Sequence, residues 1–280
     1  MNKTISLALI KKFENYLIEE EKASATLEKY IRDVRAFFEW IKGEKIDKRK
    51  VLCYKEYLKG KFAPASVNSV LSSLNSFFEF NRWYDLKVKT LKIQKQIFAQ
   101  KEKELTKDEY DRLLDAAKKK SNERLYLLMQ TICSSGIRVS ELQYITVEAA
   151  KVKRANINLK GKVRVVILPK KLCKTLLQYA KEQKITSGSL FITKTGKPLD
   201  RSTIWKMMKT LCESANVDKE KVFPHNLRHL FARTYYSIQK DIVRLADILG
   251  HSSVNTTRIY TMETGDIHRR QIQSLGLLRT

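Results

Sequence analysis

Two arginines and one tyrosine in this sequence have the side chains needed to transfer a phosphoryl group. Arg138 stands in CSSGIRVSEL, just after a Ser-Ser-Gly break, and Arg228 lies near the start of the helix expected from FPHNLRHLFA. Tyr260 ends LGHSSVNTTRIY, nine residues after His251. Two guanidinium groups can clamp the non-bridging oxygens of a phosphate and neutralise a five-coordinate phosphorus. A tyrosine hydroxyl, ordinarily with a pKa of about 10, becomes a nucleophile when nearby cations favour the phenolate.

Three of the four histidines accompany these residues, and histidine transfers protons near neutral pH. His225 follows Pro224 at a helix start, and His229 lies four positions further along the same side. This spacing also suits a zinc-binding pair. Arg228 projects from that side as well, and its fixed positive charge opposes cation binding. We therefore favour proton transfer and expect no bound metal.

Each segment also has a purely structural interpretation. Arg138 can pair with Glu141, three positions on, at a helix surface. Gly250 to Ser253 is typical of a helix stop followed by a helix cap, and a lone tyrosine such as Tyr260 usually packs with its hydroxyl satisfied. The combination of all three segments in one chain favours phosphoryl transfer without a metal, with a lysine to protonate the leaving oxygen.

Motifs for nucleotide-driven or metal-driven chemistry are missing from the sequence. TKTGKPL lacks the first glycine of a P-loop, and no G-x-G-x-x-G occurs. Clustered carboxylates of the kind that hold two metal ions are also missing. We therefore expect no cofactor. The cysteines have no CxxC spacing and are expected to be buried free thiols: Cys53, Cys133, Cys173 and Cys212.

The balance of charge is strongly basic. The chain has 55 Lys and Arg against 30 Asp and Glu, a net charge of +25. Such an excess repels itself unless a polyanion neutralises it, and nucleic acid is the commonest polyanion. No apolar run approaches the ~20 residues that span a membrane, and ISLALI lacks the flanks of a signal peptide. We expect a cytoplasmic protein that associates with nucleic acid and not with a membrane.

Residues 1–86 predict a bundle of four helices with apolar residues at helical spacing. They come from ISLALIKKFENYLIEEEK, SATLEKYIRDVRAFFEWIKG, KRKVLCYKEYLKG and PASVNSVLSSLNSFFEFNRW. Ser24 is the expected cap and Gly43 the stop of the second helix, and Pro64 fits the first turn of the fourth. Residues 87–103 hold six lysines against one glutamate with little periodicity. They predict a basic linker that either passes close to phosphates or is a solvated loop.

Residues 104–280 predict a second domain that is mainly α with a small β-sheet. Thr106 and Glu109 have the spacing of a capping box. RANINLKGKVRVVILP alternates around Gly161, which predicts a hairpin, and SLFITKTGKPLD predicts a further strand and turn. Helix resumes at RSTIWKMMKTLCESAN, and residues 266–278 have the apolar spacing of a tail helix.

The chain resembles the tyrosine recombinases, the integrase family of site-specific DNA recombinases. SSGIRVSEL, HNLRH, LGHSS and TTRIY stand in the order and at the intervals of that family, and SATLEKYIRDVRAFFEW resembles its DNA-clamping domain. The resemblance covers nearly the whole chain. It implies an N-terminal four-helix, SAM-like core-binding domain and a C-terminal catalytic domain.

The resemblance also implies a role for each matching residue. Arg138 and Arg228 bind the phosphate, and Tyr260 is the nucleophile. His225 assists acid–base catalysis, and His251 hydrogen-bonds the scissile phosphate.

Two further matches concern the support of this site. Glu141 matches the acidic residue that supports the first arginine. The catalytic lysine of the family sits in a hairpin turn, which points to Lys160; this hairpin is one residue shorter than the commoner form, so Lys162 is an alternative. YTMETG lacks the histidine that many relatives have two positions after the tyrosine, and we expect no chemical consequence.

The implied reaction is strand exchange through a 3′-phosphotyrosyl bond, which stores the energy of the phosphodiester and needs no cofactor. In the family four protomers act on two DNA duplexes. Residues 266–278 then pack into a neighbouring protomer or, alternatively, fold on their own subunit.

Two other activities fit part of the pattern. The complete residue set argues against a DNA-binding protein of this fold that no longer cuts. The small four-helix domain argues against a type IB topoisomerase, which rejoins the same strand. Because the chain starts at that domain, we expect the compact Xer-type or simple mobile-element form, for which both element integration or excision and dimer resolution are suitable functions.

Overall fold

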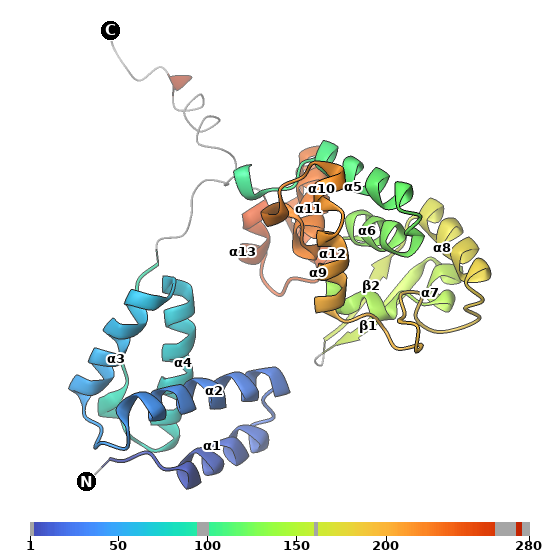
Figure 1. Cartoon of the computed structure of the whole chain (residues 1–280). Coiled ribbons are helices and arrows are strands. Elements are labelled where there is room, and N and C mark those ends of the chain that lie inside the picture. Colours follow the sequence, from blue (N-terminus) through green and yellow to red (C-terminus); the bar gives the residue numbers. More distant parts are fainter. Residues whose placement is uncertain (1–2, 94–100, 160–161, 261–272, 276–280) are drawn as a thin grey trace. The chain divides into compact units, whose positions relative to one another are not determined.

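The chain divides into two compact units, Met1–Lys95 and Gln96–Thr280 (Figure 1). The computed structural model describes residues 3–93, 101–159, 162–260 and 273–275. Each unit has its own hydrophobic core. The division lies within residues 87–103, and the predicted fold class, mainly α with a small β-sheet, is confirmed.

The N-terminal unit is built from helices at the places where the sequence predicts them. Ser6 caps the first helix by accepting a hydrogen bond from the backbone of Leu9, and Pro64 is the first residue of the fourth. The elements are α1 (Leu7–Glu19), α2 (Ser24–Ile41), α3 (Lys48–Lys61), α4 (Pro64–Phe80) and the 3-10 turn η1 (Tyr84–Leu86).

Aromatic side chains dominate the core of this unit. Phe13 and Phe77 are fully buried and meet edge to face, with ring centroids 5.2 Å apart. Asp33 of α2 is also buried and accepts hydrogen bonds from Lys29 at 2.7 Å and from Ser73 of α4 at 2.8 Å. This satisfied carboxylate ties α2 to α4.

The beginning of the predicted linker belongs to this unit. Asn75 exchanges two hydrogen bonds with the backbone of Val88, at 2.8 and 2.9 Å. Asn68 does the same with Leu91, at 2.9 and 2.6 Å. These bonds fasten the start of segment 87–103 along α4, so this part is not a free solvated loop.

The second unit carries the remaining helices and the β-hairpin. Thr106 and Glu109 form the predicted capping box. The elements before the hairpin are η2 (Lys101–Lys103), α5 (Lys107–Lys119), α6 (Glu123–Ser135), η3 (Val139–Tyr144) and α7 (Val147–Val152). Those after it are α8 (Lys170–Glu182), α9 (Arg201–Lys209), α10 (Cys212–Ala215), η4 (Lys219–Lys221), α11 (Pro224–Gln239), α12 (Ile242–Leu249), α13 (Val254–Thr257) and η5 (Arg258–Tyr260).

The hairpin confirms the predicted strand pair. β1 (Arg154–Leu159) and β2 (Lys162–Ile167) are antiparallel. Ala155 pairs with Val166, and both are buried. Because side chains alternate along a strand, this inward face also includes position 164. The turn residues 160 and 161 lie outside the described residues.

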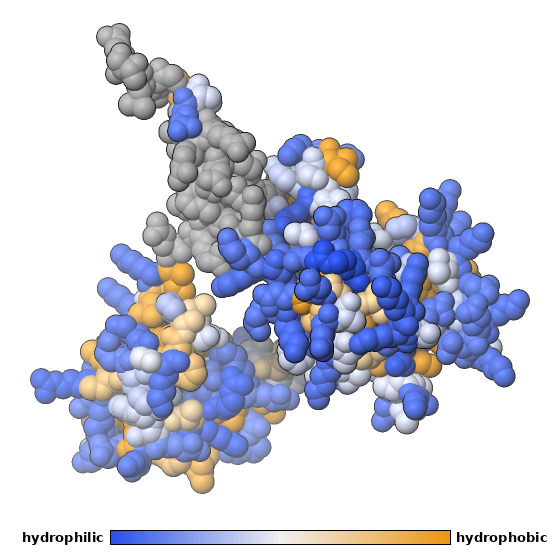
Figure 2. All heavy atoms as spheres, turned by 45° about the horizontal axis from the view of Figure 1, so that its top comes forward, coloured by the Kyte–Doolittle hydropathy of each residue, from blue (hydrophilic) through white to orange (hydrophobic). Residues whose placement is uncertain are grey.

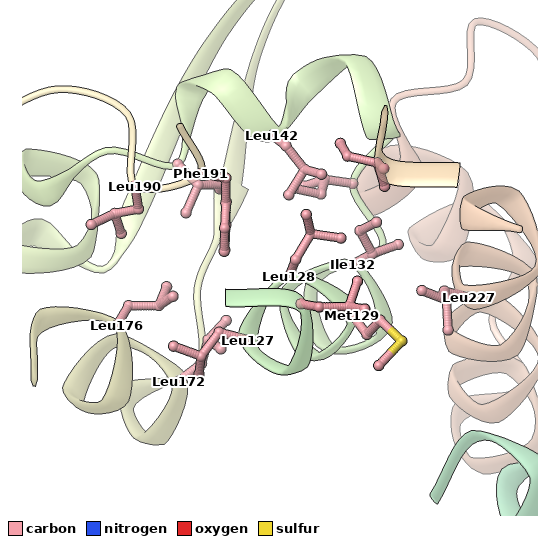
Figure 3. Close-up of a cluster of buried hydrophobic side chains, with 14 of the residues drawn as sticks. Leu127, Leu128, Met129, Ile132, Leu142, Leu172, Leu176, Leu190, Phe191 and Leu227 are labelled. Atoms are coloured by element: carbon pink, nitrogen blue, oxygen red, sulfur yellow. The ribbon is translucent and has the colours of Figure 1, made fainter. Parts of the chain in front are cut away.

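The core of the second unit surrounds α6. Figure 3 shows its side chains among those of η3, α8, α11 and the segment after α8. Because α6 is buried on several sides, its side chains pack against the turn that follows it and against α11, and this packing fixes the positions of both. The labelled residues are Leu127, Leu128, Met129, Ile132, Leu142, Leu172, Leu176, Leu190, Phe191 and Leu227.

Three predictions need correction. Ser24 is the first residue of α2 and not its cap: the cap position is Ala23, whose carbonyl already accepts the first backbone bonds. In SLFITKTGKPLD, Ile192 forms an isolated bridge with Pro198, because proline has no N–H to extend a ladder. Cys53 is exposed, because it points away from the core-facing side of α3, and Cys133 is half-buried; the described cysteines are free thiols.

Polar side chains cover most of the face shown in Figure 2, with scattered apolar residues between them. Within the part of the chain that the structure describes, no helix is both long enough and apolar enough to cross a membrane.

Candidate active site

A tight turn after α6 positions Arg138. Gly136 ends the helix with φ +64°, a left-handed conformation that favours glycine. A Cβ atom at this position would lie 2.4 Å from Cδ1 of Phe231 on α11, so the two elements approach too closely for any side chain. The turn leaves Arg138 at the N-cap of η3.

We expect Gly136→Ala to lower the free energy of unfolding by at least about 1 kcal/mol, because it combines backbone strain with a backbone-to-ring clash. Gly60→Ala is the matched control, since nothing lies within 4 Å of a Cβ there and Gly60 is helical. The control should gain about 0.5–1 kcal/mol. Urea unfolding measures both variants; equal stabilities would contradict the packing of this turn.

Glu141 fixes Arg138 from the first turn of η3. The carboxylate, on a residue 2% exposed, accepts hydrogen bonds from the backbone N–H of Arg138 at 2.7 Å and from its Nη1 at 2.9 Å. Arg164 of β2 adds a bond of 2.6 Å to Oε2. Burial by itself raises the pKa of Glu141, but the hydrogen bonds from Arg164 and Arg138 outweigh it and the pKa is lowered. The carboxylate is therefore ionised at neutral pH.

Arg228 lies at the centre of the site, one turn into α11 after Pro224. It is 1% exposed. Its guanidinium donates to the carbonyl oxygens of Gly136 and Leu249, the second at 2.8 Å, and Nη2 lies 3.0 Å from Nε2 of His251. Burial, and next the charge of Arg138, lower the pKa of Arg228 to about 10, so it remains a cation.

His251 follows the stop of α12. Gly250 has φ +63°, and the backbone N–H of His251 donates to Ala246. Nδ1 lies 2.8 Å from Oγ1 of buried Thr257. Because arginine can only donate, Nε2 accepts from Arg228, and the proton of the neutral ring is assigned to Nδ1.

Tyr260 is 5% exposed and faces the same centre. Its ring is stacked on that of His251, with centroids 6.0 Å apart, and meets His229 edge-on at 4.7 Å. Its phenol lies near the Arg228 guanidinium, and this neighbour raises the pKa of Arg228 against the larger effect of burial. Its apolar neighbours are Ala232, Leu245 and Leu249.

A pocket of about 360 Å³ opens beside these residues. His225 is exposed at its wall, and partial desolvation, Arg228, Arg201 and Arg138 all lower the pKa of His225. The pocket is lined by Ile137, Arg138, Val139, Ser140, Arg201, Trp205, Phe223, Pro224, His225 and Arg228.

His229 is the inner neighbour of His225, with ring centroids 4.4 Å apart. Its Nε2 is buried and has no hydrogen-bond partner among the described residues. Burial, followed by the charges of His225 and Arg233, lowers the pKa of His229 to about 3. Among the described residues, no group of three or more His, Cys, Asp or Glu side chains is arranged to hold a metal ion.

The pKa of His251 is lowered to about 4, first by burial and then by Arg228 and Arg138. Between pH 6.5 and about 4 the unfolded chain therefore binds a proton that the folded chain does not, so folded-state stability falls as pH falls through this window. We expect His251→Gln to make this fall shallower, by up to about 1.4 kcal/mol per pH unit. Denaturant unfolding from pH 7.5 to 4.5 measures it; identical slopes would contradict the assignment.

The sequence-predicted residues whose side chains the structure describes come together. Glu141 contacts Arg138, and Arg228 and Tyr260 both contact or adjoin His251. His225 shares a pocket with Arg138 and Arg228. Lys160 lies outside the described residues. Of Lys162, the structure describes the backbone, which pairs with Leu159.

Arg164, Arg201 and Trp205 were not predicted from the sequence. Arg164 did leave a signal, because strand alternation puts it on the inward face with Val166, where a charged side chain needs a partner. Arg201 is the first residue of α9 and Trp205 lies one turn later, and neither left a comparable signal in the sequence.

Comparison with known proteins adds family models that match both units. Residues 103–265 match the phage integrase family, and residues 10–84 match the phage integrase N-terminal SAM-like domain. Tyrosine recombinase XerA of Thermococcus kodakarensis is 30% identical over 281 residues, which cover 96% of this chain and 95% of that protein.

Solved structures share the fold. A lambda integrase dimer bound to a COC′ core site has a TM-score of 0.76 with 18% identity, covering 94% of this chain and 96% of that one. A lambda integrase tetramer bound to a Holliday junction has a TM-score of 0.74 with 18% identity, covering 92% of this chain and 77% of that one.

The fold and the family matches define an enzyme that cleaves and rejoins DNA strands. The chain belongs to the phage integrase family and is a site-specific tyrosine recombinase. The alternatives of a type IB topoisomerase and a non-cutting DNA-binding protein are not favoured.

Proposed function

We propose that Tyr260 attacks a DNA phosphate, forms a 3′-phosphotyrosyl bond and expels a 5′-hydroxyl. The position of Tyr260 carries this proposal. Its phenol lies near the Arg228 guanidinium, and its ring lies against His251 and His229 of the same chain. A neighbouring guanidinium favours the phenolate, which is the nucleophilic form. The attack therefore takes place within one subunit.

The pocket lined by Arg138, His225 and Arg228 is the proposed phosphate site. Arg138 and Arg228 line it, and the Arg138 side chain is 37% exposed there. Glu141 and the carbonyl of Gly250 hold the Arg138 guanidinium before substrate arrives. Preorganised cations of this kind stabilise the extra charge of a five-coordinate phosphorus without reorganising during the reaction.

Proton transfers complete the proposed cycle. His225 accepts the Tyr260 proton as the new P–O bond forms, and Lys160 or Lys162 protonates the departing 5′-oxygen. His251 hydrogen-bonds the phosphate. In the second step the 5′-hydroxyl of a partner strand gives its proton to that lysine and attacks phosphorus. The bond to Tyr260 breaks, and His225 returns a proton to the tyrosine. One phosphodiester is made for each one broken, so no ATP is consumed.

The proposed substrate is double-stranded DNA with a specific recombination site, on which four copies act on two duplexes. The net charge of +25 supports a polyanionic partner. The likeness to a lambda integrase described as a tetramer on a Holliday junction supports the assembly. Element integration or excision and dimer resolution both fit this reaction, and we place the protein with the DNA in the cytoplasm.

The two units divide the work in this proposal. Residues 1–86 clamp the DNA, residues 87–103 connect the domains, and residues 104–280 catalyse strand exchange. The match of residues 10–84 to the SAM-like domain supports the first assignment. Residues 266–278, the expected tail helix and its exchange between protomers, lie largely outside the described residues and stay a prediction.

A nicked duplex carrying the recombination site tests the proposal. Cleavage next to the nick releases a short fragment that diffuses away, so the covalent complex accumulates and runs as a shifted band on a denaturing gel. The reaction should proceed in EDTA and without ATP. Cleavage that requires a divalent metal, or that leaves no protein-linked strand, would overturn the proposed function.

A further inference from the structure

Arg164 of β2 joins the hairpin to two other parts of the site. Its side chain is 13% exposed. Nη2 and Nε donate to the two carboxylate oxygens of Glu141 at 2.6 and 3.3 Å. Nη1 donates to the carbonyl of Ile248 at 2.7 Å. A single guanidinium therefore bridges η3 and the C-terminal end of α12, whose residue numbers are more than 100 apart.

The end of α12 offers three successive carbonyl groups, and each is held by a different arginine. Arg164 binds the carbonyl of Ile248, Arg228 binds the next at 2.8 Å, and Arg138 binds that of Gly250 at 3.1 Å. The last carbonyls of a helix have no partner within the helix and carry partial negative charge, which favours cations. This helix end thus fixes the relative positions of side chains from β2, α11 and η3.

Gly250 makes room for this arrangement. A Cβ atom there would lie 2.4 Å from Cδ of Arg164 and 3.0 Å from its Nε. The stem of Arg164 is therefore packed against the backbone of Gly250, which directly precedes His251. Any shift of Arg164 moves its contacts to Glu141 and to this backbone together.

We propose that Arg164 is a positioning residue for the phosphate clamp. It holds Glu141, and through Glu141 it holds Arg138, in register with the helix end that carries His251. This inference rests on the proposed function and extends it to a residue outside the phosphate pocket. Lysine cannot replace Arg164, because one ammonium nitrogen cannot span Glu141 and the Ile248 carbonyl as the planar fork does.

The test compares Arg164→Met and Arg164→Lys with wild type on the nicked duplex. Both variants should cleave roughly 100-fold more slowly, as expected when reacting groups are displaced by about 1 Å. Binding of the uncleaved duplex should change by less than about threefold, since many other phosphate contacts carry affinity. Arg154→Lys is the matched control, because Arg154 is exposed on the neighbouring strand and should cleave like wild type.

A second substrate separates positioning of the clamp from general loss of structure. Replacing one non-bridging oxygen of the scissile phosphate by methyl removes its negative charge, and with it most of the need for a guanidinium clamp. Relative to wild type on the same substrate, the defect of the Arg164 variants should then shrink at least about tenfold, and Arg138→Ala should show the same pattern.

Three results would overturn the inference while leaving the proposed function intact. They are cleavage by Arg164→Met at the wild-type rate, cleavage by Arg164→Lys at the wild-type rate, or an equal loss of rate on the phosphate and the methyl-substituted duplexes. If Arg164→Met melts below the assay temperature, Arg164→Lys, which keeps a cation beside Glu141, carries the comparison. Failure of the wild-type protein to cleave the phosphate substrate would overturn the proposed function itself.

Discussion

Arg228→Lys will lose DNA cleavage by at least about 1,000-fold, because Arg228 is both a phosphate ligand in the proposed reaction and the structural centre of the site. Its guanidinium reaches the carbonyls of Gly136 and Leu249 and Nε2 of His251. A lysine ammonium offers three donors on one nitrogen and cannot meet acceptors spread around a planar fork.

The same substitution will lower stability. Each buried polar group left without its partner costs about 1–3 kcal/mol, so the free energy of unfolding should fall by at least about 2 kcal/mol. Cleavage is measured in single-turnover reactions at a temperature where the variant is folded, and stability by urea unfolding. Arg244→Lys on α12 is the control, because Arg244 is exposed and should retain both properties. Near-normal cleavage by Arg228→Lys would contradict the central position of this side chain.

Tyr260→Phe will abolish the covalent complex and leave the fold intact. Phenylalanine keeps the ring contacts with His251 and His229 and removes the hydroxyl near Arg228. Removal of a nucleophile can reduce a catalysed rate by roughly 10⁶-fold, whereas loss of one hydrogen bond costs only about 1 kcal/mol of stability.

Tyr235→Phe is the matched control for this variant. Tyr235 packs against the same small cluster as Tyr260, so its substitution should leave the adduct unchanged. Gel shift under native conditions and denaturing electrophoresis measure binding and adduct separately. An adduct that persists in Tyr260→Phe would exclude Tyr260 as the nucleophile.

Local features of this fold could be predicted because they depend on residues close in sequence. Glu109 stands three positions after Thr106, and the two form a capping box. Gly250 ends α12 as expected from LGHSS. Ser253 likewise caps α13. Such signals involve backbone groups within one turn, so neighbouring side chains decide them. The prediction of Ser24 as the cap of α2 was wrong by one residue, because adjacent residues compete for the cap position.

The contacts between elements that assemble the site could not be predicted from the sequence. Arg164 and Ile248 are 84 positions apart, and their hydrogen bond depends on how β2 packs against α12. Strand alternation placed Arg164 inward but could not name its partners. Nε2 of His229 is buried without a hydrogen-bond partner among the described residues, and the ring of Tyr260, 31 positions further on, packs edge-on against that of His229.

The central claim is that Tyr260 becomes covalently joined to DNA. The most direct measurement is protease and nuclease digestion of the trapped complex, followed by mass spectrometry of the modified peptide. We predict a nucleotide joined through its 3′-phosphate to Tyr260. A nucleotide on another residue, or one joined through its 5′-phosphate, would contradict the account.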